Sequence, residues 1–163
     1  MRPYQIFASM QPETAARFFG GLAEGSPVMY AQLVHAAAAA MKSRPAYVQK
    51  LSADKKASAM RRALARVGAD PLAEEMLAVY FLECRKDVLV EWLDGLGIEH
   101  EDGSLKEDAP AQPDEAKLRE LVASFRSGDD APERELLLHA FAAQRAIEWP
   151  VLNALIEGDS ASD

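Results

Sequence analysis

The sequence predicts an all-α fold: a single-domain helical bundle of about six to eight helices with short loops around a buried central helix at residues 71–96. Three observations lead to this prediction. Apolar residues recur at helical spacing, and no stretch alternates apolar and polar residues as a half-buried strand does. Stop and start signals, such as Gly68 followed by Asp70-Pro71, divide the chain into segments of helical length. The links between most of these segments are short, as in helical bundles.

Two helices are expected before the basic part of the chain. The first follows Ser9. Ser26-Pro27 then has the pattern of an N-cap followed by proline at the first helical position, which predicts a helix to about Lys42. The alanines at 36–40 combine high helix propensity with small side chains, so we expect a neighbouring helix to approach closely there. Arg44-Pro45 marks a break, and a short helix is expected directly after it.

The next segment, 53–67, is expected to form an amphipathic helix with a basic side. Ser52 is its expected N-cap. At about 100° per residue the apolar positions form one narrow stripe, which comprises Ala53, Ala57, Met60, Leu64 and Val67. Basic residues occupy the opposite side with Ala59 between them, namely Lys55, Arg62 and Arg66. The segment therefore predicts a helix that buries one side and exposes a basic one.

The central helix, 71–96, is expected to be the most buried element. Asp70 is its expected N-cap, and Pro71 suits the first helical position. Every residue from Met76 to Leu82 is apolar or aromatic. A helix that is apolar on all sides is buried on several of them. The helix is expected to end near Leu96, where glycines precede and follow.

The C-terminal part predicts a polar loop and three further helices. Residues 98–112 are polar, and Asp102-Gly103 is a turn signal compatible with a small hairpin. Helices are expected to begin at Pro113-Asp114, near Asp130 and at Pro150. We expect one all-helical domain over residues 1–157, with 98–112 as the place of any subdivision. Residues 158–163 are expected to form a frayed tail.

Charge is sorted by position along the chain. Between Lys42 and Arg66 there are eight basic residues and one acid, so this segment carries +7. Residues 1–41 are balanced, and residues 67–163 carry −15, which together give the net charge of −8. Charge asymmetry of this kind is a clue to partners rather than to fold.

Composition limits the class of protein. The chain has 163 residues with 49% hydrophobic and 27% charged, which is ordinary for a globular domain. A single cysteine, Cys84, excludes an internal disulfide framework and favours a reducing compartment. No apolar stretch reaches the roughly 20 residues of a membrane span, and the N-terminus lacks a signal-peptide core. We therefore expect a soluble, cytoplasmic protein that does not contact a membrane.

No motif in the sequence predicts a catalytic, cofactor-binding or metal-binding residue. The three histidines lack metal-ligand spacing, and no phosphate-binding or nucleophile motif is present. The acidic loop 99–102 fails the calcium-loop pattern, so a solvated turn is favoured over a weak metal site. Cys84 in mid-helix is expected to be a buried small hydrophobe rather than a nucleophile.

Arg85 is the most unusual charged residue in the sequence. On a continuous helix it falls beside Phe81 and Trp92, inside the apolar arc. A buried guanidinium needs a carboxylate or an aromatic face. Two interpretations follow, an internal ion pair with another helix, which we favour, and an anion-binding pocket.

Three functional hypotheses remain open. The first is a non-enzymatic helical interaction or scaffold module that binds a protein partner or itself, as a homodimer for example. The second is binding of nucleic acid or another polyanion through the basic helix 53–67. The third is a helical enzyme or small-ligand binder with a pocket near Arg85. The candidate anion or partner contacts are Lys55, Arg62, Arg66 and Arg85. We also expect the basic helix to pair with the protein's own acids, such as Glu74 and Glu75.

Overall fold

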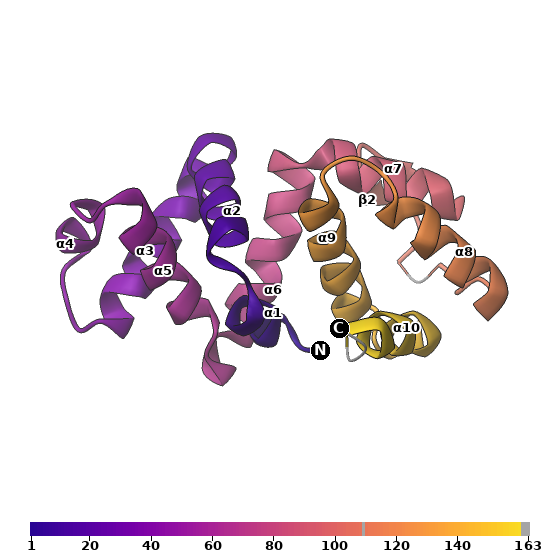
Figure 1. Ribbon diagram of the computed structural model, residues 1–163. Helices are drawn as coiled ribbons and strands as arrows, with labels where there is room; N and C mark the ends of the chain where they lie inside the picture. Colours follow the sequence, from indigo (N-terminus) through magenta and orange to yellow (C-terminus); the bar gives the residue numbers. More distant parts are fainter. Residues whose placement is uncertain (109, 161–163) are drawn as a thin grey trace. The chain divides into compact units, whose positions relative to one another are not determined.

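A computed structural model describes residues 1–108 and 110–160 (Figure 1) and confirms the all-α prediction. The described residues form ten α-helices and a pair of two-residue strands. The elements in order are α1 (Pro3–Ser9), α2 (Pro12–Gly25), α3 (Pro27–Ala40), α4 (Pro45–Gln49), α5 (Ala53–Leu64), a 3₁₀ turn (Val67–Ala69), α6 (Asp70–Val79), a π-helical turn (Tyr80–Cys84), α7 (Lys86–Leu96), β1 (His100–Glu101), β2 (Ser104–Leu105), α8 (Glu115–Arg126), α9 (Ala131–Gln144) and α10 (Pro150–Ser160). No helix among the described residues is long and apolar enough to cross a membrane.

The helices group into two compact units. The N-terminal unit comprises Arg2–Cys84, and the C-terminal unit comprises Arg85–Asp163 together with Met1. The division lies at Cys84–Arg85, whereas the sequence suggested 98–112 as the place of any subdivision. Of the expected tail, Gly158 and Asp159 are part of α10, and residues 161–163 lie outside the described residues.

An aromatic cluster holds the N-terminal unit together. The ring centroids of Phe7 and Phe18 lie 5.2 Å apart, those of Phe18 and Phe19 5.1 Å, and those of Phe18 and Tyr80 4.4 Å. All four side chains are buried. Such ring pairs contribute about 0.5–1.5 kcal/mol each beyond the area that they bury. The cluster therefore joins α1, α2 and the π-helical turn.

The helix α1 was not predicted from the sequence. Asp70, the expected N-cap of 71–96, lies instead at the first position of α6 and accepts a hydrogen bond from the Tyr4 backbone N–H at 3.0 Å. Its carboxylate also pairs with Arg2. A seven-residue helix is marginal by itself, so α1 depends on these contacts and on the burial of Ile6 and Phe7.

The expected continuous helix 71–96 is divided in the structure. After α6 the chain forms a π-helical turn, and Arg85 leaves helical geometry with φ −131° and ψ 45°. A side chain at Gly21 would meet the Tyr80 ring at 3.0 Å, so α2 approaches this turn very closely. The structure has more helices than predicted for two reasons. The expected helix 71–96 is divided into α6 and α7, and α1 is an additional helix.

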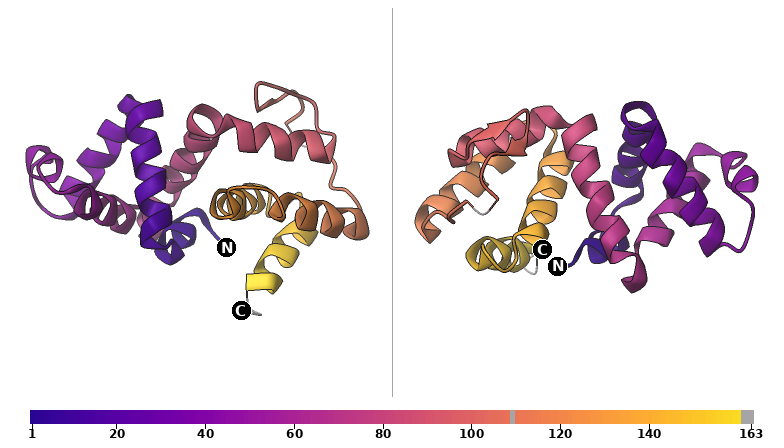
Figure 2. Two further views of the ribbon diagram at one scale, coloured as in Figure 1. Left: turned by 45° about the horizontal axis from the view of Figure 1, so that its top comes forward. Right: turned by 180° about the vertical axis from the view of Figure 1, so that it is seen from behind.

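The C-terminal unit, whose helices are drawn as ribbons in Figure 2, has its own aromatic core. Trp92 lies 5.0 Å from Phe125 and 5.9 Å from Phe141, and Phe141 lies 5.3 Å from Trp149 (ring centroids). The Trp149 indole N–H donates to the Pro110 carbonyl at 2.8 Å. The loop before α8 is therefore tied to the start of α10.

Candidate interaction surface

The two units differ in charge. Arg2–Cys84 contains ten basic and seven acidic residues, a net of +3. Arg85–Asp163 contains eight basic and nineteen acidic residues, a net of −11. The uneven distribution of charge along the sequence therefore corresponds to a difference in net charge between the two compact units.

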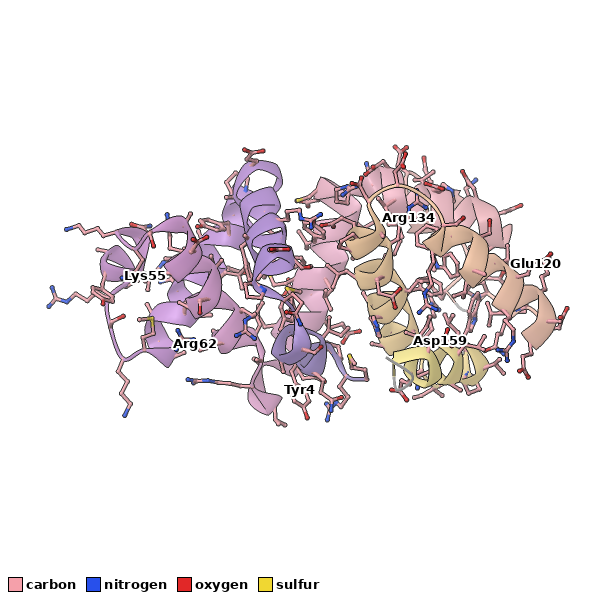
Figure 3. The ribbon with its side chains drawn as sticks, in the orientation of Figure 1. Tyr4, Lys55, Arg62, Glu120, Arg134 and Asp159 are labelled. Atoms are coloured by element: carbon pink, nitrogen blue, oxygen red, sulfur yellow. The ribbon has the colours of Figure 1, made fainter. Side chains whose placement is uncertain are left out.

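Six exposed basic residues lie on α5 or directly beside α3, α4 and α5, three helices that contact one another; Figure 3 labels two of them, Lys55 and Arg62. They extend from the turn that follows α3 to the residues just after α5. We call this set the basic surface; it comprises Lys42, Arg44, Lys50, Lys55, Arg62 and Arg66. The two other basic residues of the +7 segment, Lys56 and Arg61, are half-buried.

None of these eight basic residues forms an ion pair with an acid in the part of the chain that the structure describes. By contrast, five arginines elsewhere do so, namely Arg2, Arg85, Arg119, Arg126 and Arg134. The expected pairing of the basic helix with Glu74 and Glu75 is not present among these ion pairs. The +7 segment is thus left without a carboxylate at contact distance.

Three arginines of the +7 segment donate hydrogen bonds to uncharged oxygen atoms of the N-terminal unit. Arg61 donates to the carbonyls of Phe7 and Ala8, both at 3.3 Å, at the end of α1. Arg66 donates to the Ala40 carbonyl at 3.4 Å, and Arg62 to the Ser58 hydroxyl at 3.2 Å. Cations favour the C-terminal ends of helices, where carbonyls lack partners. Arg61 and Arg66 therefore help to hold helices together.

Lys55 has no side-chain bond to a described residue, and its backbone completes a cap. The Ser52 hydroxyl accepts from the Lys55 backbone N–H at 3.4 Å, as the cap prediction required. The predicted apolar stripe is buried at Ala57, Met60 and Leu64, whereas Ala53 is exposed and Val67, which lies beyond the helix, is 64% exposed. Ala59, expected on the basic side, is buried, because α5 contacts α1, α2, α3, α4 and α6.

Lys42 occupies a backbone position that favours glycine. Its φ is +52°, in the left-handed region. The Lys42 N–H donates to the Ala39 carbonyl at 3.1 Å and the Ser43 N–H to the Ala38 carbonyl at 2.9 Å, which is a Schellman ending of α3. A non-glycine residue in this conformation costs roughly 1–2 kcal/mol. A lysine of the basic surface is therefore held in an unfavourable backbone conformation.

Apolar side chains are exposed among these charges. Tyr47 on α4 is 55% exposed and Met41 is 43% exposed. Tyrosine and methionine are enriched at protein interfaces. Tyr47 is the one aromatic residue between positions 42 and 66, and it is exposed because α4 buries its neighbour Val48 instead.

A hollow of about 410 Å³ lies between the start of α2 and α5. Its lining residues are Pro12, Glu13, Ala15, Ala16, Asp54, Ala57, Ser58 and Arg61. The one cation in that lining, Arg61, is already bonded to the carbonyls of α1. The hollow therefore offers two carboxylates and small side chains rather than an unbonded anion site.

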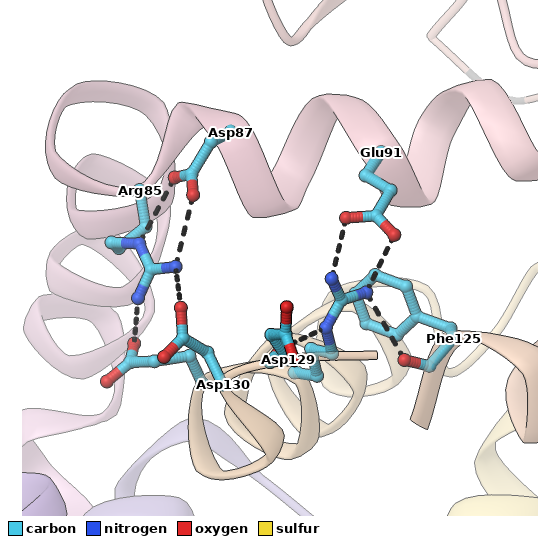
Figure 4. Close-up of polar contacts among 8 residues, drawn as sticks. Arg85, Asp87, Glu91, Phe125, Asp129 and Asp130 are labelled. Atoms are coloured by element: carbon cyan, nitrogen blue, oxygen red, sulfur yellow. Dashed lines mark hydrogen bonds and ion pairs between the residues drawn. The ribbon is translucent and has the colours of Figure 1, made fainter. Parts of the chain in front are cut away.

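Arg85 forms an internal ion-pair cluster (Figure 4). Its guanidinium donates to both oxygens of Asp87 at 3.1 Å and to Asp130 at 3.0 Å, and it lies 3.7 Å from the Glu133 carboxylate. The hydrogen bonds that Arg85 donates to Asp87, together with the charge of the nearby carboxylates, raise the pKa of Arg85. This geometry agrees with the interpretation as an internal ion pair with another helix, since Asp130 and Glu133 lie at the start of α9.

Cys84, which the sequence predicted to be buried in mid-helix, is the last residue of the π-helical turn. Cys84 is half-buried, and burial, followed by the charge of Glu83, raises the pKa of its thiol. The thiolate is therefore disfavoured. Within residues 1–108 and 110–160 no group of three or more His, Cys, Asp or Glu is arranged to hold a metal ion.

Comparisons with known proteins give no family. No protein-family model matches the chain, and neither the curated proteins nor the solved structures yield a match.

Proposed function

We propose that this chain is a non-enzymatic helical interaction module that binds an acidic protein surface through its basic surface. The observation that carries the proposal is the segment of +7 with no ion pair to a described acid, next to exposed Tyr47 and Met41. An acidic partner would supply the missing carboxylates. Electrostatic complementarity of this kind mainly sets specificity and the rate of association. A cytoplasmic location belongs to the same proposal, and fractionation of cells that express the tagged chain tests it.

A protein partner is favoured over nucleic acid because the basic segment is poor in aromatic side chains. Single-stranded nucleic acid is bound by several stacking aromatic side chains, and Tyr47 is the single aromatic residue between 42 and 66. Nucleic acid remains the second candidate function, because the basic surface could contact phosphates.

The test compares an acidic peptide with DNA. The probe is a fluorescein-labelled peptide of alternating glutamate and leucine, and the competitor is a single-stranded DNA of the same net charge. We expect the peptide to bind, with an affinity that falls as salt rises, and the DNA to bind more weakly. Stronger binding of the DNA would favour the second candidate, and no binding of either probe at low salt would refute the proposal.

Two substitutions at equivalent helix positions identify the surface. Lys55 lies three residues after the cap Ser52, and Lys117 lies three residues after the cap Asp114, whose carboxylate accepts from the Lys117 N–H at 3.0 Å. Both lysines are exposed. Lys55→Glu should weaken binding of the peptide about tenfold, whereas Lys117→Glu, with the same change of charge, should leave it unchanged within about twofold. Equal effects would show that net charge alone is responsible.

A further inference from the structure

We propose that the acidic partner is a second copy of this chain, whose exposed carboxylates at 99–108 dock on the basic surface. The inference rests on the proposed function and names the partner. Its first support is the charge of the two units, +3 and −11, which makes the chain complementary to itself. The occupant is one segment of the C-terminal unit, which we call the acidic segment, residues 99–108.

The acidic segment has the same lack of partners as the basic surface. Its five acids are exposed, and none forms an ion pair with a described residue; they are Glu99, Glu101, Asp102, Glu107 and Asp108. The segment contains one basic residue, Lys106, so its net charge is −4. Elsewhere in the same unit some acids, such as Asp87, Glu91 and Glu135, are paired, whereas others, such as Glu120 and Glu148, form no ion pair with a described residue. The acidic segment gathers five such carboxylates in ten residues, and its charge is opposite to that of the basic surface.

The backbone of the acidic segment is held in place. Its tip is a tight turn in which Asp102 has φ +50° and Gly103 φ +88°. The Gly103 N–H donates to His100 Nδ1 at 3.2 Å, and His100 Nε2 lies 2.7 Å from Asp94 Oδ1 on α7. With Nδ1 as acceptor, Nε2 carries the proton and donates to Asp94. A fixed segment loses less conformational entropy when it binds, which favours its use as a docking element.

Lys42 supplies one charge of the basic surface from an unfavourable backbone conformation. A glycine at φ +52° would end α3 without strain, yet a lysine is present. Residues held in unfavourable backbone conformations are concentrated at functional sites. A positive charge needed for an acidic partner gives a physical reason for the lysine.

The geometry of this docking is asymmetric. One copy offers its C-terminal unit and the other its N-terminal unit. Contacts between different patches either close into a ring or dimer or continue as an open chain. In every case each contact joins one basic surface and one acidic segment. Two variants can therefore test the contact, one altered in the basic surface and one in the acidic segment.

The first variant lowers the positive charge of the basic surface by changing two of its six basic residues, and both changes suit the local backbone. Lys42→Gly relieves the strained turn, and Lys55→Glu places a glutamate three residues after the Ser52 cap, which is the capping-box pattern. The second variant, Glu99→Lys with Glu101→Lys, reverses the charge of two exposed side chains of the acidic segment. Lys117→Glu is again the matched control. Circular dichroism checks that each variant is folded.

Sedimentation velocity measures the association. We expect the unaltered chain to self-associate at about 0.05 M salt and to dissociate at about 0.5 M, where charge is strongly screened. Each double variant alone should associate at least about tenfold more weakly, and Lys117→Glu should associate like the unaltered chain. An equimolar mixture of the two double variants should form a complex again. In that mixture one partner still has a basic surface and the other an acidic segment.

Three results would overturn the inference. The unaltered chain could remain a monomer at low salt and at the highest concentration that stays soluble. The Lys42→Gly, Lys55→Glu variant could associate as strongly as the unaltered chain, or the mixture could fail to form a complex. Binding of the glutamate–leucine peptide separates this failure from that of the proposed function. If the peptide binds and the chain stays monomeric, the module binds a different acidic protein.

Discussion

Replacement of Arg134 should destabilise the C-terminal unit more than replacement of its carboxylate partner. The Arg134 side chain is 9% exposed, whereas that of Glu91 is 56% exposed. The guanidinium donates to both Glu91 oxygens at 2.9 and 2.7 Å and to the Phe125 carbonyl at 3.2 Å, and also to the Asp129 carbonyl (Figure 4). It lies 4.7 Å from the Phe125 ring centroid.

The magnitude follows from what each substitution leaves behind. Arg134→Met keeps most of the side-chain volume but leaves the Asp129 carbonyl without its donor, which costs about 1–3 kcal/mol. Loss of the cation–π contact adds about 1 kcal/mol. The freed Glu91 costs little, because it is exposed enough to return to water and surface pairs are worth about 0–1 kcal/mol. We therefore expect Arg134→Met to cost about 2–4 kcal/mol and Glu91→Gln about 1 kcal/mol.

The assay is urea unfolding followed by circular dichroism and tryptophan fluorescence. Trp92 and Trp149 both belong to the C-terminal unit, so fluorescence monitors that unit. The double variant completes a cycle, and we expect its loss to be smaller than the sum of the single losses by about 1 kcal/mol. A loss for Glu91→Gln that equals or exceeds that for Arg134→Met would refute the assignment of Arg134 as the anchor.

Three further predictions concern other elements. Lys42→Gly should raise the free energy of unfolding by about 0.5 kcal/mol, since the relief of strain exceeds the added flexibility of glycine; a lower midpoint of urea unfolding would contradict this. Asp70→Ala should cost about 1 kcal/mol, because Tyr4 N–H loses its acceptor, while Asp70→Asn, which keeps an oxygen there, should cost less. The pKa of Glu135 is lowered to about 2, first by its hydrogen bond to His139 and also by Arg126. Its stabilising effect is therefore present above about pH 4.5 and is lost as pH falls toward 2, so Glu135→Gln should flatten the loss of stability over that range.

The sequence was a good guide to helix beginnings. Ser52 and Asp114 cap α5 and α8 with their side chains, and Pro27, Pro45 and Pro150 lie at helix starts. These signals are local, because a cap acts on backbone N–H groups within three residues. Asp102-Gly103 likewise forms the turn of the β1–β2 hairpin.

The features that sequence patterns missed depend on distant residues. Asp70 serves α1, which lies 66 residues away in the chain, rather than only its own helix. Asp130 has φ +60° and gives its carboxylate to Arg85 instead of capping α9. In both cases a residue with a strong local preference is used by another element. A helical wheel cannot show this, because it treats each segment as continuous and isolated.

The basic surface shows the same distinction for charge. The sequence located the +7 segment, and the natural expectation was that neighbouring acids would neutralise it. The acids that follow the segment in sequence do not do so, since Glu74 and Glu75 form no ion pair with it and Asp70 is engaged by Arg2 and Tyr4. Two arginines of the segment, Arg61 and Arg66, bond to helix carbonyls rather than to carboxylates. The strained Lys42 and the exposed Tyr47 belong to this part of the structure. The basic surface is therefore defined by individual residues as well as by composition, and substitutions at these residues can test its role.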